Sequence, residues 1–317
     1  PVPWEVTVTY REGTINGPEA ILKASTQVDL FQEDIIDAWK MGITMLPIKD
    51  LLKSQGVQQR SIANAYDQWL EAGEPETVRN LYEKSPERIN AACEKMNDWV
   101  YQHAKLYIEQ GKIIGLLGDH STPLGLIRAM AEKHSSFGIL QIDAHADLRP
   151  AYKGLEYSHA SIAHNFMKIP EVKHLVQVGV RDLCEQEWAY IQSEKKISLY
   201  TDDQLKEEQY LGVNWSEICK RIIADLPEKV YLTIDIDGLL PHLCPNTGTP
   251  VPGGLDYQQL MFLIKMLVKS GRQIIGFDLV EVAPGESGDE WDAIVGARIL
   301  YRVANLVGLS QGKLSWC

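Results

Sequence analysis

The chain has 317 residues, of which 45% are apolar and 23% are charged, a composition that is typical of globular proteins and excludes extended disorder. The formal net charge is −12, and the Lys and Arg residues are spread along the sequence, so a nucleic-acid partner is disfavoured and a cationic substrate is favoured.

Membrane insertion and disulfide bonding are not predicted. No segment approaches the roughly 20 consecutive apolar residues of a membrane span, and the N-terminus lacks a basic region followed by an apolar one. The five cysteines are odd in number, lie far apart and form no CxxC pair, which indicates reduced thiols in a cytoplasmic protein. The sequence starts at Pro1 without Met, as expected of a trimmed chain.

The first predicted elements are helical. Residues 45–90 combine charges, Gln, Gly, Ser and Pro without a strong strand pattern, which predicts an exposed helical insertion over one end of the fold. Residues 87–109 form an amphipathic helix in this prediction. Its buried face is assigned to Ile89, Cys93, Met96, Val100 and Leu106.

Apolar, β-branched runs then alternate with helical patterns, and most are followed by Gly or Asp. The predicted strands are residues 113–117, 137–142, 175–180, 230–236 and 274–279. Strands that alternate with helices predict an α/β fold, a parallel sheet with helices on both faces. No linker divides the chain, so residues 1–317 are predicted to form a single domain.

Three of these strands end in possible metal ligands. The first is followed by Gly-Asp-His-Ser at 118–121, the second by Asp-Ala-His-Ala-Asp at 143–147, and the fourth carries Asp-Ile-Asp at 235–237. Ligands bind beyond the carboxyl ends of strands in open α/β sheets, so these side chains are expected to converge. A single strand-end Asp pair more often caps the next helix, but three such ends favour a shared site.

The predicted cluster is suited to metal ions. Buried carboxylates repel one another and lose hydration, and a bound cation removes that cost. Two imidazoles with four carboxylates suit Mn²⁺ better than Zn²⁺, which prefers thiolates and fewer ligands. Because carboxylates can bridge, the set fits two ions about 3.5 to 4 Å apart. The D-x-H-x-D spacing would place its side chains on one face of an extended segment.

The combined motifs resemble the ureohydrolase family, which includes arginase, agmatinase, guanidinobutyrase and formiminoglutamase. The matching segments are residues 118–121, 143–147, 158–161, 235–254, 278–284 and 12–21. They span nearly the whole chain apart from the helical insertion. The resemblance implies a three-layer α/β/α fold with a central, mainly parallel sheet, assembled as a homo-oligomer, often a trimer or hexamer.

The resemblance also implies the site residues. Two Mn²⁺ ions, or Ni²⁺ or Co²⁺ in their place, would be bound by His120, Asp143, His145, Asp147, Asp235 and Asp237. Asp143 and Asp235 would bridge the ions, with His120 and Asp147 on one and His145 and Asp237 on the other.

Two further residues match family positions that act on the substrate. His159 matches the histidine that delivers a proton to the departing amine, and the ligand Asp147 is also counted among the catalytic residues. Glu281 matches the carboxylate that holds the cationic group of the substrate. Taken alone, His159 could be a helix-capping residue, and Glu281 could pair with Arg298 or cap a turn. The loop at residues 247–254 is expected to be scaffolding.

The substrate prediction comes from residues 148–157. These residues lack the Asn, Thr and Ser cluster with which arginases bind the α-carboxylate and α-amine of their substrate. The pattern resembles that of agmatinases, so the predicted reaction is hydrolysis of agmatine to putrescine and urea. Arg149 is either a substrate-binding residue that receives a carboxylate, as guanidinobutyrate would need, or a brace for acidic neighbours. Leu117, Leu240 and Ala283 depart from the family pattern without removing a ligand.

Other functions remain open at this stage. Guanidinobutyrate, free guanidine and formiminoglutamate are alternative substrates within the family. A metal-dependent deacetylase on a related fold would not normally supply all six ligands. A catalytically silent metal-binding subunit is the alternative from a different class, and the presence of the six ligands with His159 and Glu281 argues against it.

Overall fold

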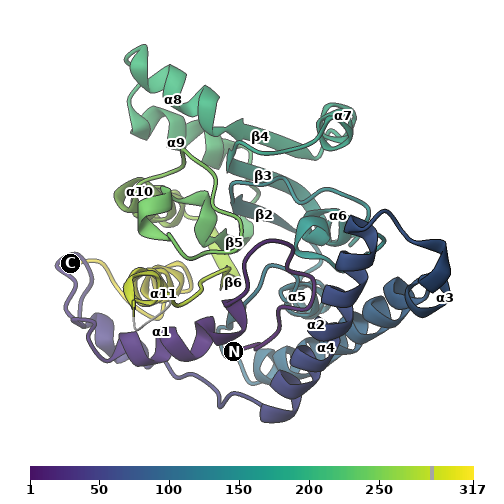
Figure 1. The fold of residues 1–317 in the computed structure, drawn as a ribbon. Coiled ribbons are helices and arrows are strands. Elements are labelled where there is room, and N and C mark those ends of the chain that lie inside the picture. Colours follow the sequence, from purple (N-terminus) through teal and green to yellow (C-terminus); the bar gives the residue numbers. More distant parts are fainter. Residues whose placement is uncertain (286–288) are drawn as a thin grey trace.

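Within residues 1–285 and 289–317, which the computed structural model describes, six strands form one all-parallel sheet in the order β1-β6-β5-β2-β3-β4 (Figure 1). The strands are β1 (Gly115–Gly118), β2 (Phe137–Ile142), β3 (Val172–Val180), β4 (Ile197–Thr201), β5 (Lys229–Asp235) and β6 (Gln273–Val280).

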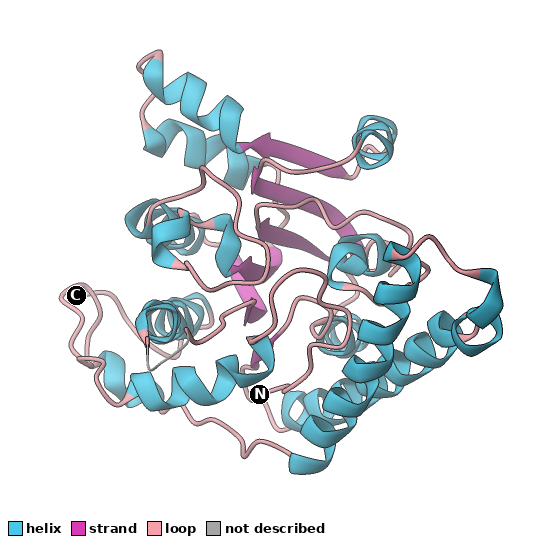
Figure 2. Ribbon diagram, viewed as in Figure 1, coloured by secondary structure: helices cyan, strands magenta, loops and turns pink. Residues whose placement is uncertain are grey.

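Helices cover both faces of this sheet, as Figure 2 shows in cyan around the magenta strands. On one face lie α1 (Gly17–Ser25), α8 (Asp202–Tyr210), α9 (Trp215–Ala224), α10 (Tyr257–Lys269) and α11 (Trp291–Ser310). On the other lie α4 (Ser85–Glu109), α5 (Leu124–Lys133), α6 (Ile162–Phe166) and α7 (Glu185–Ser193). Helix α2 (Asp50–Glu71) packs outside α4, followed by the short α3 (Arg79–Tyr82).

The apolar core is divided by the sheet into two clusters. One contains Leu140 and Leu232 with the buried faces of α9, α10 and α11, and the other contains Ile139 and Tyr231 with those of α4 and α5. Neighbouring residues of one strand thus enter opposite clusters because side chains alternate along a strand. Helices cover both faces of β2, which explains an apolar run that only Gln141 interrupts.

The predicted fold class is confirmed, and each of the five predicted strands is present with bounds shifted by no more than a few residues. The predicted amphipathic helix is α4, but one assignment on its buried face is wrong. Leu106 is 51% exposed, and the apolar face continues instead through Ala104 and Ile108. Within the predicted insertion at residues 45–90, residues 50–71 and 76–82 are helical and residues 45–49 are not, and its status as an insertion stays a prediction.

Helix α11 is long and apolar enough, by length and composition alone, to cross a membrane. It packs against α1, α10 and β6 within one of the core clusters, and 61% of its most apolar window is buried. Burial in the fold accounts for its composition. The five cysteines form no disulfide bond.

Candidate metal centre

The register of the sheet brings the predicted ligands to one level. Ile142 of β2 pairs with Ile234 of β5, and Asp235 pairs with Val280 of β6, which in turn pairs with Gly118 of β1. The segments that follow β1, β2, β5 and β6 therefore leave the sheet side by side. This explains how residues more than a hundred positions apart in sequence meet at the carboxyl edge of the sheet.

His120 lies at the centre of a first group of ligands. Its Nδ1 atom is 3.1 Å from a carboxylate oxygen of each of three aspartates, Asp143, Asp147 and Asp235. Its other ring nitrogen, Nε2, is 3.0 Å from Oγ1 of Thr233. Thr233 donates its own hydroxyl proton to Asp278 at 2.7 Å, so Nε2 of His120 must be the donor. Nδ1 therefore faces three carboxylates and needs a positive charge between them.

A second group shares one residue with the first. Nδ1 of His145 is 3.1 Å from Asp237 and 3.6 Å from Asp143. His120, Asp143 and Asp147 could hold one ion, and Asp143, His145 and Asp237 could hold another. Because Asp143 belongs to both groups, the geometry agrees with its predicted bridging role. Asp235 contacts the first group through His120, and its bridging role stays a prediction.

The electrostatics of the cluster agree with a requirement for cations. Burial raises the pKa of Asp147 to about 7 and raises the pKa of Asp235 well above its ordinary value. Burial also opposes protonation of His120, but the three aspartates around Nδ1 raise its pKa well above the ordinary value. Two divalent ions would balance the four carboxylates, so the residues present fit a pair of hard or borderline metal ions.

A buried chain of hydrogen bonds orients His120 from behind. Thr233 and Tyr231 of β5 both donate to Asp278 of β6, the latter at 2.8 Å. Sequence reasoning treated these residues only as strand interior. The available signal was an acidic residue in the middle of an otherwise apolar strand, since a buried Asp requires partners.

Replacing Thr233 with valine should weaken Mn²⁺ binding about 10- to 100-fold, the usual effect of losing a residue that orients a ligand. Valine keeps the shape but cannot accept the proton from Nε2 of His120. Calorimetric titration of the metal-free variant measures this, with Thr26→Val, at the exposed end of α1, as the control. Unchanged affinity would show that Thr233 does not orient His120.

The predicted catalytic residues border the cluster. Glu281 is buried, and its Oε1 accepts the backbone N–H of His120 at 2.7 Å, so it does not pair with Arg298 in the way considered above. His159 begins a short turn, and its backbone nitrogen is 3.4 Å from Oγ1 of Thr7. The His159 ring lies edge-on to the Tyr152 ring, with centroids 6.5 Å apart. Burial lowers the pKa of His159 to about 3.

Two site carboxylates have left-handed backbones. Asp147 has φ 55° and Glu281 has φ 62°, a region that non-glycine residues rarely occupy. Asp147 therefore reaches His120 through a turn, and the extended D-x-H-x-D segment predicted from spacing alone is wrong at its last residue. Pattern periodicity cannot detect such a turn because the surrounding contacts impose it.

Arg149 lies beside the cluster but not in it. Its Nε atom is 3.5 Å from Glu187, and its guanidinium group lies over the Tyr152 ring at 5.2 Å. These contacts agree with the bracing alternative.

The loop at residues 247–254 contacts the site more closely than predicted. Thr247 donates to the backbone oxygen of Glu281 at 2.8 Å, and Thr249 donates to Asp237 at 3.2 Å. Its hydroxyl groups therefore support ligands directly, in addition to the scaffolding that was predicted.

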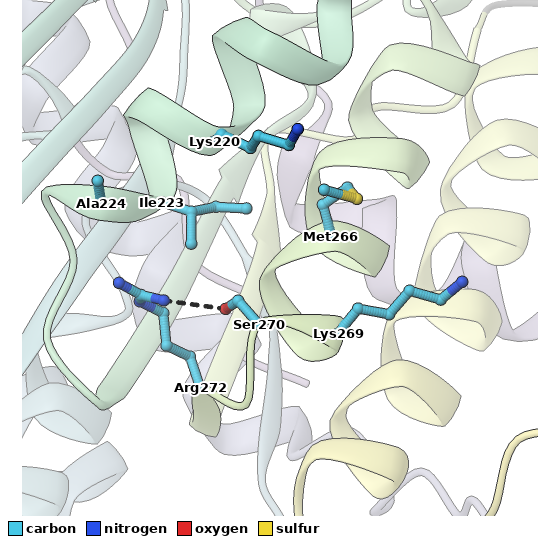
Figure 3. A pocket seen from close by; sticks show the side chains of 7 residues that line it. All are labelled: Lys220, Ile223, Ala224, Met266, Lys269, Ser270 and Arg272. Carbon is cyan, nitrogen blue, oxygen red and sulfur yellow. Dashed lines mark hydrogen bonds between the residues drawn. The ribbon is translucent and has the colours of Figure 1, made fainter.

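A separate surface pocket of about 310 Å³ lies between α9 and α10, near the start of β6 (Figure 3). It is lined by Lys220, Ile223, Ala224, Met266, Lys269, Ser270 and Arg272. This pocket lies at the amino ends of the strands, whereas the clustered His and Asp residues lie at the carboxyl ends. It offers no carboxylate or imidazole ligand and is not part of the candidate site.

The fold and the cluster together define an α/β protein whose sheet edge is suited to a pair of divalent metal ions. The chain belongs to the arginase family, whose family model matches residues 1–305. It is therefore an arginase-family hydrolase, and membership of this family implies a binuclear metal site.

Similar proteins agree with this assignment. The N(1)-aminopropylagmatine ureohydrolase of Thermus thermophilus is 30% identical over 99% of this chain and 91% of its own length. The agmatinase of Chromobacterium violaceum is also 30% identical, over 94% of this chain and 79% of its own. The crystal structure of an agmatine ureohydrolase from Thermoplasma volcanium superposes with a TM-score of 0.68 over 98% of this chain and 89% of its own, at 20% identity, and supports the fold.

Proposed function

We propose that this hydrolase cleaves the guanidino group of a decarboxylated, amine-bearing substrate, with agmatine as the first candidate and putrescine and urea as products. The observation that carries the proposal is the meeting of His120, Asp143 and His145 with Glu281 at one sheet edge. N(1)-aminopropylagmatine, named for a relative at 30% identity, is the second candidate. The two share a guanidinium head and differ in the length of the amine-bearing tail.

The residues proposed to hold two Mn²⁺ ions, or Ni²⁺ or Co²⁺, are those predicted from the sequence. When bound, such a pair supplies hydroxide at neutral pH, which a resonance-stabilised guanidinium carbon requires as a nucleophile. The protein positions the ligands, because Asp143 contacts both groups and Thr233 fixes the orientation of His120.

Glu281 is the proposed partner of the substrate guanidinium group. Its Oε1 is occupied by the N–H of His120, and no described residue donates to Oε2. A bound guanidinium could donate to that oxygen through a charge-assisted hydrogen bond. Burial raises the pKa of Glu281 well above its ordinary value, and a substrate cation would restore the charged carboxylate.

His159 is proposed to move a proton to the departing nitrogen. Because burial keeps its ring neutral at pH 7, the ring must gain a proton inside the site before it can donate one. Its edge-on contact with Tyr152 and the bond from its backbone N–H to Thr7 fix its position beside the cluster.

The substrate preference also rests on Arg149. Arg149 is the residue of this loop that was considered as a partner for a substrate carboxylate. Because its guanidinium group pairs with Glu187, the carboxylate-bearing substrates arginine and guanidinobutyrate are disfavoured. The test is urea release by Mn²⁺-loaded protein from agmatine, N(1)-aminopropylagmatine, arginine, guanidinobutyrate and guanidine at equal concentrations. Preference for either of the first two supports the proposal, and preference for guanidinobutyrate would make Arg149 a substrate-binding residue.

Glu281→Gln should raise the KM for agmatine by about 10- to 100-fold, the cost of removing one hydrogen bond to a charged group. The amide oxygen of glutamine still accepts the N–H of His120, so metal content should stay at the wild-type value. Steady-state kinetics with elemental analysis measures both quantities. Unchanged KM would remove Glu281 from the substrate-binding residues.

We further propose a cytoplasmic homo-oligomer, trimeric or hexameric, with a place in polyamine biosynthesis that follows from putrescine as product. Guanidinobutyrate, free guanidine and formiminoglutamate remain alternative substrates, and a silent metal-binding subunit is the alternative if no urea is released. Light scattering measures the oligomeric state directly.

A further inference from the structure

Helix α2 contacts two separate segments of chain that flank His159. Arg60 and Asn64 contact the N-terminal segment, residues 6–12, and Tyr66 and Asp67 contact residues 152–156. In Figure 1 this helix lies outside α4, beside the purple N-terminal chain. None of the roles proposed above uses it.

Arg60 fixes the N-terminal segment by three contacts. Its Nη1 donates to the backbone oxygens of Val6, at 3.2 Å, and Val8, and its Nε pairs with Glu12 at 2.9 Å. Thr7, between the two bonded carbonyls, accepts the backbone N–H of His159. The Arg60 side chain is only 12% exposed, and its two bonds to backbone oxygens are partly buried, whereas the Glu12 side chain is 51% exposed. The backbone that carries Thr7 is therefore held from α2.

The second segment turns sharply just after Tyr152. Lys153 has φ 52° and Gly154 has φ 79°, and the left-handed conformation is unfavourable for lysine because its Cβ crowds the backbone. Two residues of α2 hold this turn. The Tyr66 hydroxyl donates to the oxygen of Lys153 at 3.2 Å, and Asp67 pairs with its Nζ at 2.9 Å. Asn90 of α4 also donates to the oxygen of Gly154 at 3.1 Å, so Tyr152, whose ring meets His159, is placed by a turn that α2 and α4 hold together.

The spacing of these contacts follows the helix. Residues 60, 64 and 67 lie on one face of α2, and Arg60 and Asp67 are about 10 Å apart along its axis. A hydrogen-bonded helix is stiff over two turns. It can therefore hold the Thr7 segment and the Tyr152 turn at a constant separation.

We propose that α2 positions the two segments that contact His159, at Thr7 and Tyr152, and that Arg60 and Asp67 are positioning residues that hold them at the separation that agmatine-like substrates require. We call these two segments the walls of the site. The proposal rests on the proposed function for its substrate. It assigns a role to the helical segment that the sequence alone left unexplained. Asp67 acts through Lys153, and Arg60 acts through residues 6–8.

The test compares Asp67→Asn with Glu132→Gln. Both remove the charge of one carboxylate in an ion pair with lysine, but Glu132 pairs with Lys105 at the far end of α5, away from the site. Asp67→Asn should raise the KM for agmatine about two- to fivefold, as expected for one partly exposed ion pair, and a fall in kcat through the Tyr152 contact with His159 should be no larger than this factor. Asp67→Glu should restore the wild-type KM, and Glu132→Gln should keep it.

Hydrogen–deuterium exchange tests the positioning role of α2 independently of the substrate. Asp67→Asn should speed amide exchange within residues 150–156, and Arg60→Met within residues 5–12, while Glu132→Gln changes neither segment. If wild-type protein releases no urea from any guanidino compound, the proposed function fails and exchange alone decides whether α2 holds the walls. Unchanged exchange in both segments, or an equal KM for Asp67→Asn and Glu132→Gln, would overturn the proposal.

Discussion

Asp143→Ala is expected to remove both metal ions and to lower kcat/KM for guanidine hydrolysis by at least about 10³-fold, because each ion contributes several kcal/mol of stabilisation to such reactions. Asp143 is the residue common to both ligand groups, with one oxygen 3.1 Å from His120 and the other 3.6 Å from His145. No other side chain of the cluster is shared in this way. Elemental analysis of the purified variant measures the loss directly.

His145→Ala is the matched comparison for this variant. His145 belongs only to the second group, so its loss should leave one ion bound and still remove nearly all activity. Asp143→Asn keeps the side-chain size and one oxygen for the backbone N–H of His145, and circular dichroism of this variant separates metal loss from failure to fold. Two ions still bound to Asp143→Ala would contradict the bridging assignment.

His159→Ala should keep both ions and lower kcat by about 10²- to 10⁴-fold, the usual contribution of a positioned proton donor. The ring lies beside the cluster and is not a member of either ligand group, so its removal should not disturb the metals. Stopped assays of urea release, with metal content measured on the same sample, report the two effects separately.

His164→Ala is the control for this variant. His164 lies one turn further along the chain, in α6, and its ring faces Tyr190 with centroids 6.0 Å apart. Its replacement should leave kcat close to wild type. If His159→Ala and His164→Ala show the same kcat, another group must supply the proton.

Much of this architecture follows from local pattern. The apolar run at Phe137–Ile142 predicts β2 at its observed bounds because helices bury both of its faces. Strand β4 was missed because Ile197–Thr201 is short, lies at the sheet edge and is only half-buried, so it lacks a continuous apolar run. Leu106 was misplaced because it lies six residues after Val100, about 240° around the helix, whereas Ala104 and Ile108 keep the four-residue spacing of the buried face.

Part of the candidate site could likewise be predicted from the sequence, and part could not. The six predicted ligands meet because the parallel register brings strand ends to one level, a consequence that can be drawn from sequence. The supporting contacts could not be drawn from it. Thr233 and Asp278 are ordinary strand residues until β5 and β6 are paired, and Arg60 and Asp67 meet the site only through tertiary packing.

Titration of metal-free protein with Mn²⁺, followed by urea release from agmatine, tests most directly the claim that this chain is a binuclear amidinohydrolase. We expect activity to be absent without metal and to reach its plateau at two ions per chain, as the two ligand groups that share Asp143 require. Full activity in the absence of metal, or a plateau at one ion per chain, would contradict the account.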